Sequence, residues 1–490
     1  MAFFTLFSST ALFYTRLLII KHFYHFYKNI KFYFFIFLCY SESEKITSEN
    51  CDHFAALALQ IGGMLMKRCD SRYKAYIEIL KEELVPAMGC TEPIAIAYAA
   101  AVAERELGTL PDRVEIGASG SIIKNVKSVI VPNTGHLKGI PAAAAAGIVA
   151  GEPDKKLEVI SSVTKEQIAE IKNFLEKTDI RISQIENGLT FDLIVTLFKG
   201  NSSAKVRIAN YHTNIVLIEK DGQVKFEAPA AGESEENLTD RSLLTMEGIW
   251  DFISSVEIED IRPILSRQIQ YNTAIAEEGL AHPYGANIGK VILANSEHSA
   301  ANEAKAMAAA GSDARMNGCE LPVVINSGSG NQGITASVPV IVYAKRLGSS
   351  EEELYRALAL SNLTTIHQKT PIGRLSAFCG AVSAGAGAGA GIAYLRGGGY
   401  EEVIHTVVNA LAIVSGMVCD GAKASCAAKI AAAVDAGIMG FNMYRQGQQF
   451  QCGDGLVTDG VEATIQNIGR LGREGMKQTN QEIISMMIGR

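Results

Sequence analysis

The chain has 490 residues, of which 48% are hydrophobic and 20% charged, with a formal net charge of −7. A chain of this length can bury a large core over two or three lobes, which excludes general disorder. Its basic residues are not clustered and it has one Trp, so we expect no nucleic-acid partner. Its nine cysteines lack the dense spacing of a small secreted disulfide framework. This favours a reducing, cytoplasmic location with thiols available for metal binding or catalysis.

Residues 1–65 differ in composition from the rest of the chain. The first 40 contain 10 of the 19 Phe and 5 of the 16 Tyr, and no Gly, Pro, Asp or Glu. Arg16, Lys21, Lys28 and Lys31 interrupt the apolar runs, so no stretch has the roughly 20 apolar residues of a spanning helix, and we expect no stable membrane insertion. AT-rich codons encode such a composition. We therefore interpret 1–65 as a non-globular extension that begins at a start codon assigned too early, with a membrane anchor or a cleaved signal peptide as alternatives.

Residues 66–151 are expected to form the first part of a catalytic domain. The apolar period of SRYKAYIEILKEEL predicts a helix, and a second helix is predicted from CTEP to a stop at Gly108. VEIGAS and SVIVP have the pattern of short strands, and GIPAAAAAGIVAG that of a closely packed helix. Cys90 is thereby placed at a helix N-terminus, where the helix dipole lowers the pKa of a thiol. A buried cap neighbour without chemistry is the alternative.

Residues 152–235 are expected to form a small α+β lobe. FDLIVTLFKG, AKVRIANY, TNIVLIEKDG and QVKFEA alternate apolar and polar residues, and Lys-Asp-Gly at 220–222 predicts a hairpin. Residues 236–490 are rich in Ala and Gly and are predicted to be helical apart from LPVVINS. The predicted fold class is α+β: a predominantly helical catalytic domain with a small inserted α/β lobe of short antiparallel strands.

A glycine-rich turn, NSGSGNQGI, follows that last strand. Gly328, Gly330 and Gly333 match the spacing of a dinucleotide-binding loop. Pro339 makes TASVPVIVYA a poor crossover helix, and no acidic residue ends a second strand, so this interpretation is disfavoured. We expect instead that the turn, with Ser329, Asn331 and Gln332, holds a substrate carboxylate at a helix start. GAGAGAGIAY at 385–394 lacks a preceding strand and is interpreted as a closely packed helix.

Several single polar residues in small-residue contexts are weaker candidates. Arg315 is the most suitable clamp for a substrate carboxylate, because its guanidinium matches two oxygens. Lys124 is a second candidate for substrate binding. For each such residue an ordinary hydrogen-bonding role is the alternative. The others are Asn125, His136, His212, Asp313 and His367.

Three cysteines stand in segments with small neighbours: Cys379, Cys419 and Cys426. A structural zinc site would want Cys-x2-Cys pairs, which the sequence lacks. Iron–sulfur clusters accept more variable spacing, and three ligands leave one iron open to substrate. From spacing alone, core packing and a cluster both remain open. In the cluster interpretation, one Gly-containing loop delivers Cys419 and Cys426.

PAMGCTEPIAIAYAAAVA, SIIKNVKSVIVPNTG, SDARMNGCELPVVINSGSGNQGITASVPV, and RLSAFCGA followed by VSGMVCDGAKASC together resemble the L-cysteine desulfidase family. That family is similar to the α-chain of bacterial iron–sulfur L-serine dehydratases. The resemblance runs from about Met66 to the C-terminus. It implies that Cys379, Cys419 and Cys426 bind a [4Fe–4S] cluster and that Cys90 accepts a proton. The step from Cys419 to Cys426 is shorter than in the serine dehydratases, which favours the desulfidase branch.

Residues and resemblance together predict a lyase that converts L-cysteine to sulfide, pyruvate and ammonia. The carboxylate would lie on the glycine-rich turn and Arg315, and Cys90 would remove the α-proton. Lewis-acid chemistry at a cluster requires no pyridoxal phosphate. Deamination of L-serine at the same site and a non-catalytic iron–sulfur or thiol sensor stay open as alternatives. The expected partners are a small amino-acid substrate and further copies of the same chain in a homo-oligomer.

Overall fold

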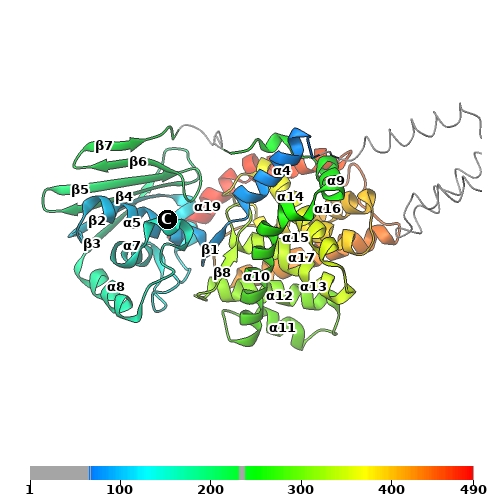
Figure 1. Cartoon of the computed structure of the whole chain (residues 1–490), viewed down its shortest axis with the longest axis horizontal. Coiled ribbons are helices and arrows are strands. Elements are labelled where there is room, and N and C mark those ends of the chain that lie inside the picture. The colour runs from blue at the N-terminus through cyan, green and yellow to red at the C-terminus, as the bar shows by residue number, and fades with distance from the viewer. Residues whose placement is uncertain (1–65, 67, 231–237, 489–490) are drawn as a thin grey trace, which may run out of the picture. The chain divides into compact units, whose positions relative to one another are not determined.

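The computed structural model describes Met66, residues 68–230 and residues 238–488. The chain divides into two compact units, Met1–Met64 and Leu65–Arg490, and every described residue belongs to the second. The predictions for residues 1–65 therefore lie outside the described residues. The second unit combines many helices with a sheet of short strands, which confirms the predicted α+β, mostly helical class (Figure 1).

The bounds of the described elements locate the site below. The helices are α4 (Ser71–Glu83), α5 (Thr91–Leu107), α6 (Gly120–Val126), α7 (Gly139–Ala150), α8 (Lys165–Lys177), α9 (Met246–Ser255), α10 (Ile258–Ala281), α11 (Ile288–Ala294), α12 (Ala300–Met316), α13 (Gly330–Leu347), α14 (Glu351–Ile372), α15 (Gly380–Leu395), α16 (Tyr400–Val414), α17 (Ser425–Arg445), α18 (Val461–Arg470) and α19 (Lys477–Ile488). The strands are β1 (Pro86–Met88), β2 (Arg113–Ser119), β3 (Asp179–Ile185), β4 (Asp192–Lys199), β5 (Ser202–Ala209), β6 (Ile215–Lys220), β7 (Gln223–Glu227) and β8 (Pro322–Val324).

The larger sheet has the strand order β3-β2-β4-β5-β6-β7. Its consecutive antiparallel strands β4 to β7 coincide with the four predicted alternating segments, and the turn after Lys220 joins β6 to β7 as predicted. The pairs are antiparallel except β2–β3, which is parallel. Apolar side chains of β4 and β5 are buried beneath α5, which packs in turn on α7. The sheet takes β2 from the segment before residue 152, and the predicted boundaries at 151 and 235 stay a prediction.

The helical part is centred on α15, which packs against α13, α14, α16 and α17 (Figure 1). Alanine and glycine let these helices approach closely: a Cβ added at Gly389 would lie 2.8 Å from the Cα of Gly437. Burial of these small residues confirms that GAGAGAGIAY is a packed helix rather than a loop. Among the described helices, none combines the length and the apolarity needed to cross a membrane.

Two local predictions are wrong. SVIVP forms no strand; its only ladder contact is an isolated bridge between Ile130 and Lys138, and the preceding SIIKNV forms α6. TASVPVIVYA is helical, because α13 continues through Pro339. Its apolar face is buried there, and this packing outweighs the hydrogen bond that proline removes.

The small ladder β1–β8 positions two predicted motifs. Pro86 pairs with Val324, and the N–H of Ile325 donates to the carbonyl of Val85 at 3.0 Å. The segment that leads into Cys90 is thereby fixed beside the segment that leads into the glycine-rich turn. Motifs more than 200 residues apart in sequence therefore begin their helices side by side.

Candidate functional site

A cavity of about 110 Å³ lies where the N-terminal ends of α5, α13, α15 and α17 meet. Each helix N-terminus presents unpaired N–H groups and the positive end of its dipole. Four such ends around one cavity favour the binding of negative charge, whether thiolate or carboxylate. Local sequence explains the arrangement, since Cys90, Ser329 and Cys379 are the N-cap residues of the first three helices.

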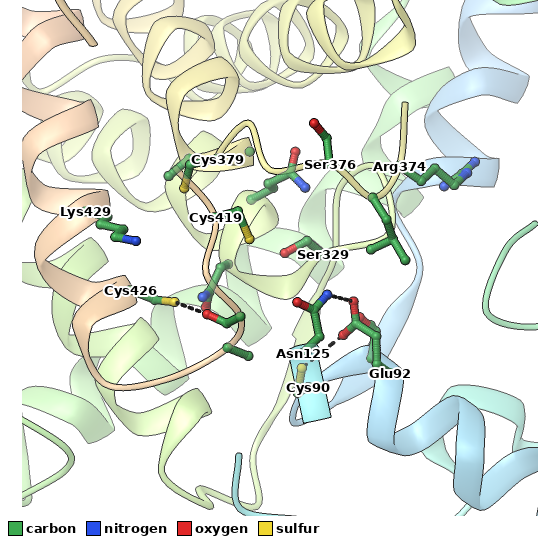
Figure 2. Close-up of a pocket in the computed structure, with 18 of the residues that line it drawn as sticks. Cys90, Glu92, Asn125, Ser329, Arg374, Ser376, Cys379, Cys419, Cys426 and Lys429 are labelled. Carbon is green, nitrogen blue, oxygen red and sulfur yellow. Dashed lines mark hydrogen bonds between the residues drawn. The ribbon is translucent and has the colours of Figure 1, made fainter. Parts of the chain in front are cut away.

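The structure brings the main sequence-predicted site residues to this cavity, whereas the weaker candidates His136, His212, Asp313 and His367 do not line it. Its lining includes Cys90, Lys124, Arg315, Ser329, Asn331, Gln332, Cys379, Cys419 and Cys426. Figure 2 shows Cys379, Cys419 and Cys426 along one side and Cys90, Glu92 and Asn125 at the other. The positions are those of a single site, and the chemical roles of the residues stay predictions.

Backbone pairing holds Cys379 beside Cys419. Phe378 and Val418 form an isolated antiparallel bridge. The N–H of Cys379 donates to the carbonyl of Met417 at 3.1 Å, and the N–H of Cys419 donates to the carbonyl of Ala377 at 2.6 Å. The prediction that one loop carries both Cys419 and Cys426 is wrong. Helix α17 begins at Ser425 and carries Cys426 in its first turn, whereas Cys419 lies in the loop before it.

The thiol side of the cavity has the chemistry of a metal-binding set. Burial, followed by the charge of Cys419, raises the pKa of Cys379 to about 12, and burial raises that of Cys426. A bound cation relieves both effects by replacing the protons. Asp420 forms ion pairs with Lys423 and Lys429 at 2.5 Å. Although burial opposes it, these contacts lower the pKa of Asp420 to about 2.

Cysteine thiolates are the donors that hold iron–sulfur clusters, and three cysteines line one side of this cavity. In the part of the chain that the structure describes, no three His, Cys, Asp or Glu side chains are grouped tightly enough to hold one metal ion. In an iron–sulfur cluster each cysteine binds a different iron, so its ligands stand further apart than those of one ion. Three partly buried thiols on two joined segments and one helix end provide the sulfur donors that such a cluster takes.

Cys90 differs from its predicted state. Its side chain is 3% exposed, and its S–H donates to Oε2 of Glu92 at 3.1 Å. Burial, then the charge of Glu92, raises the pKa of Cys90 well above its usual range. The expected lowering by the helix dipole is therefore wrong, because desolvation and an adjacent carboxylate outweigh the dipole. Cys90 is a thiol at neutral pH.

Glu92 is a functional candidate that sequence reasoning missed. It is buried and also accepts a hydrogen bond from Nδ2 of Asn125 at 2.9 Å, and Nε2 of His212 lies 3.8 Å from its Oε1. Burial alone would raise its pKa, but His212 and the hydrogen bonds from Cys90 and Asn125 lower it. An ionised carboxylate therefore lies in the cavity. The sequence offered one signal, its position in the first turn after Cys90, which fits dipole complementation equally well.

The predicted carboxylate-binding residues lie together at the start of α13. Nη1 of Arg315 donates to Oδ1 of Asn331 at 3.2 Å. Gly330 permits this approach, since a Cβ there would lie 2.2 Å from Nε of Arg315. Arg315 Nε and Gln332 Oε1 are buried without a hydrogen-bond partner among the described residues. Such orphaned atoms are rare in folded proteins and point to a ligand that pairs with them.

Other polar candidates divide between site and scaffold. Lys124 lines the cavity, and its ammonium donates to Oδ1 of Asn480 at 2.8 Å and to the carbonyl of Cys419 at 3.2 Å. His367 pairs with Glu462 at 2.7 Å and Asp313 accepts the N–H of Ile288 at 2.6 Å, so both have structural partners outside the cavity lining. Sequence reasoning also missed the following lining residues: Lys369, Arg374, Ser376 and Lys429.

Fold and site together define a mostly helical α+β protein with a cysteine-rich, cationic cavity built at helix N-termini. The family profile described as "Serine dehydratase alpha chain" matches residues 154–485, a segment that includes Cys379, Cys419 and Cys426. The chain belongs to the serine dehydratase α-chain family, whose members are lyases associated with iron–sulfur clusters.

Curated relatives match along almost their whole length. A UPF0597 protein of Desulfitobacterium hafniense is 59% identical over 425 residues, which cover 87% of this chain and 99% of the relative. A UPF0597 protein of Lachnoclostridium phytofermentans is 51% identical over 85% of this chain and 100% of its own. One from Treponema denticola is 46% identical over 85% and 98%, respectively. The chain is thus similar to an uncharacterised group within the serine dehydratase-like proteins.

Proposed function

We propose that this protein catalyses the α,β-elimination of a β-substituted L-amino acid, with L-cysteine as the preferred substrate. The products are sulfide and aminoacrylate, which hydrolyses in water to pyruvate and ammonia. The observation that carries the proposal is one cavity that joins three partly buried thiols on one side to a fourth thiol and both signs of charge on the other.

The charges of the cavity suit an amino-acid zwitterion. Arg315 and the start of α13 provide N–H donors for a carboxylate, including the unpaired Nε. Glu92 is the only carboxylate among the described lining residues, and it provides a counter-charge for the α-ammonium. Ser329, Asn331 and Gln332 add polar groups to the lining of the cavity.

Cys90 is proposed as the acceptor of the α-proton. It rests as a thiol that donates to Glu92. A thiol with a raised pKa is a stronger base once it has lost its proton, which suits the removal of a weakly acidic C–H proton. Arg315 opposes the rise in the Cys90 pKa, so the guanidinium that orients the carboxylate also favours the thiolate.

Cys379, Cys419 and Cys426 are proposed to hold a [4Fe–4S] cluster. When bound, such a cluster with three protein ligands supplies a Lewis acid for the leaving group. The protein's own contribution on this side is to bury the ligand thiols and to place Lys369 and Lys429 near them. L-Serine is the second candidate substrate, because the matching family profile is that of the serine dehydratase α chain.

The test is a substrate comparison on anaerobically purified full-length protein reconstituted with iron and sulfide. We expect a brown protein that forms pyruvate from L-cysteine faster than from L-serine. The reverse preference would assign serine dehydratase activity. A reconstituted protein with visible absorption and no turnover of either amino acid would contradict the proposal and would favour a non-catalytic iron–sulfur sensor.

A further inference from the structure

Lys369 is a buried cation whose ammonium has no partner among the described residues. It lies in the last turn of α14, is 4% exposed and lines the cavity. No hydrogen bond or ion pair of its ammonium occurs among the residues that the structure describes, although its backbone carbonyl accepts the N–H of Gly373 at 2.9 Å. Burying an ammonium costs several kcal/mol unless it is paired. The missing partner is therefore expected to be a ligand.

The other cavity cations differ from Lys369 in having partners. Lys124 donates to Asn480 and to a backbone carbonyl, Arg374 pairs with Glu83 at 2.8 Å, and Lys429 pairs with Asp420. A structural role for Lys369 in complementing the dipole of α14 leaves the ammonium's three donors unused. Helix-end electrostatics therefore does not account for its burial.

The position of Lys369 indicates which part of the substrate it meets. Its charge interacts with Cys419 and Cys379, on the thiol side of the cavity, whereas the charge of Arg315 interacts with Cys90. Lys369 therefore belongs to the thiol side of the cavity and Arg315 to the Cys90 side. If Cys90 removes the α-proton and Arg315 holds the carboxylate, the β-substituent points toward the thiol side and Lys369.

We propose that Lys369 donates a hydrogen bond to the leaving atom of the substrate, sulfur or oxygen, and stabilises the negative charge that develops there. This inference rests on the proposed elimination. In that reaction the Cys90 thiol first gives its proton to solvent. The Cα–H bond then breaks, its proton goes to the Cys90 thiolate, and its electron pair forms the Cα=Cβ bond. The Cβ–S bond breaks and its pair leaves with sulfur as HS⁻. Lys369 acts on that anion, so its effect depends on how basic the leaving group is.

The experiment compares three substrates in the reconstituted full-length enzyme and its Lys369→Met variant. L-Serine and L-cysteine release basic anions, whereas β-chloro-L-alanine releases chloride, which needs no hydrogen-bond donor. We expect kcat to fall about 100-fold with serine, the loss typical of removing one preorganised donor, and by less with cysteine, because HS⁻ is a weaker base than HO⁻. We expect less than about a fivefold fall with β-chloro-L-alanine, because the enzyme's other contacts stay in place.

Two controls separate this role from folding and binding. Lys345→Met removes an exposed ammonium from α13 and is expected to change nothing. Lys369→Met should have a Tm equal to or above the wild type, because it removes an unpaired buried charge. If the Lys369→Met variant fails to fold or loses iron, Lys369→Arg and Lys369→Gln replace it. The Lys369→Arg variant keeps the charge, so its kcat with serine must fall less than that of the neutral Lys369→Gln variant.

The outcomes are distinct. Equal losses with all three substrates would overturn the leaving-group role and assign Lys369 to substrate binding, and unchanged rates would remove any catalytic role. Wild-type protein that turns over none of the three would overturn the proposed function itself. A loss that grows with the basicity of the leaving group supports the proposal.

Discussion

Glu92→Gln tests the electrostatic account of Cys90. The substitution keeps the size of the side chain and an oxygen that accepts the hydrogen bond from Asn125, but it removes the negative charge beside the thiol. That charge is the second cause, after burial, of the raised pKa of Cys90. The variant should therefore have a lower Cys90 pKa and form the thiolate at a lower pH than the wild type.

The size of the effect follows from the separation of the two groups. Sγ of Cys90 lies 3.1 Å from Oε2 of Glu92. Two unit charges about 4 Å apart interact by about 4 kcal/mol at an effective dielectric constant near 20, which is about three pKa units. The cavity cations and the residual dipole of glutamine reduce this. We expect the pKa of Cys90 to fall by about 1 to 3 units.

Two assays measure the fall. The rate at which iodoacetamide alkylates Cys90, followed by peptide mass spectrometry across a pH series, gives the pKa of the thiol, with Cys90→Ser as the blank. The pH profile of kcat/KM reports the pKa of Cys90 as the catalytic base in the free enzyme, because activity rises as the base loses its proton. The rising limb should move to lower pH in Glu92→Gln. If both midpoints stay where they are in the wild type, the carboxylate does not control Cys90 and the assignment is wrong.

Three further predictions concern the rest of the site and its support. The ligand variants Cys379→Ser, Cys419→Ser and Cys426→Ser should each lose iron and visible absorption after reconstitution, whereas Cys90→Ser should keep both and lose turnover. Iron analysis and a pyruvate assay on the same samples test this. A colourless Cys90→Ser protein would make Cys90 a ligand instead. Gly330→Ala should raise KM at least about tenfold with a smaller effect on kcat. The new Cβ would lie 2.2 Å from Nε of Arg315 and would displace the guanidinium that is proposed to bind the substrate carboxylate. An unchanged KM would exclude this role of Arg315. Burial raises the pKa of Asp313 to about 6, so ionisation of Asp313 destabilises the fold as pH rises from about 4 to 6. In thermal melts, the free energy of unfolding of Asp313→Asn relative to the wild type should therefore rise by about 1 kcal/mol between pH 4 and pH 7. A difference that does not change with pH would contradict this.

Local patterns in the sequence sufficed for much of the fold. Alternation predicted the strands from Asp192 to Glu227, helical periodicity predicted α4, and Gly108 ends α5 with a left-handed backbone as its position suggested. These features depend on neighbours within a few residues, which a sequence displays directly. The helix through Pro339 was missed because its stability comes from burial against distant elements rather than from its own residues.

The membership of the cavity was also accessible from the sequence, because each predicted residue belongs to a distinctive motif. Cys90, Arg315, Cys379 and Cys426 each stand in such a motif, and all line one cavity. What the motifs withheld was the state of each group. A thiol at a helix N-terminus predicts a low pKa, yet Cys90 has a raised one, since burial and Glu92 act through space.

The sequence by itself therefore determined most element types of this protein, the helix N-terminus at Cys90, and the motifs whose residues line one cavity. Only the tertiary structure decided that four helix N-termini converge, that Glu92 faces Cys90, and that Lys369 is buried without a partner among the described residues. The physical reason is that secondary structure follows from short-range steric and hydrogen-bonding preferences, whereas burial and electrostatic coupling depend on which distant segments come into contact.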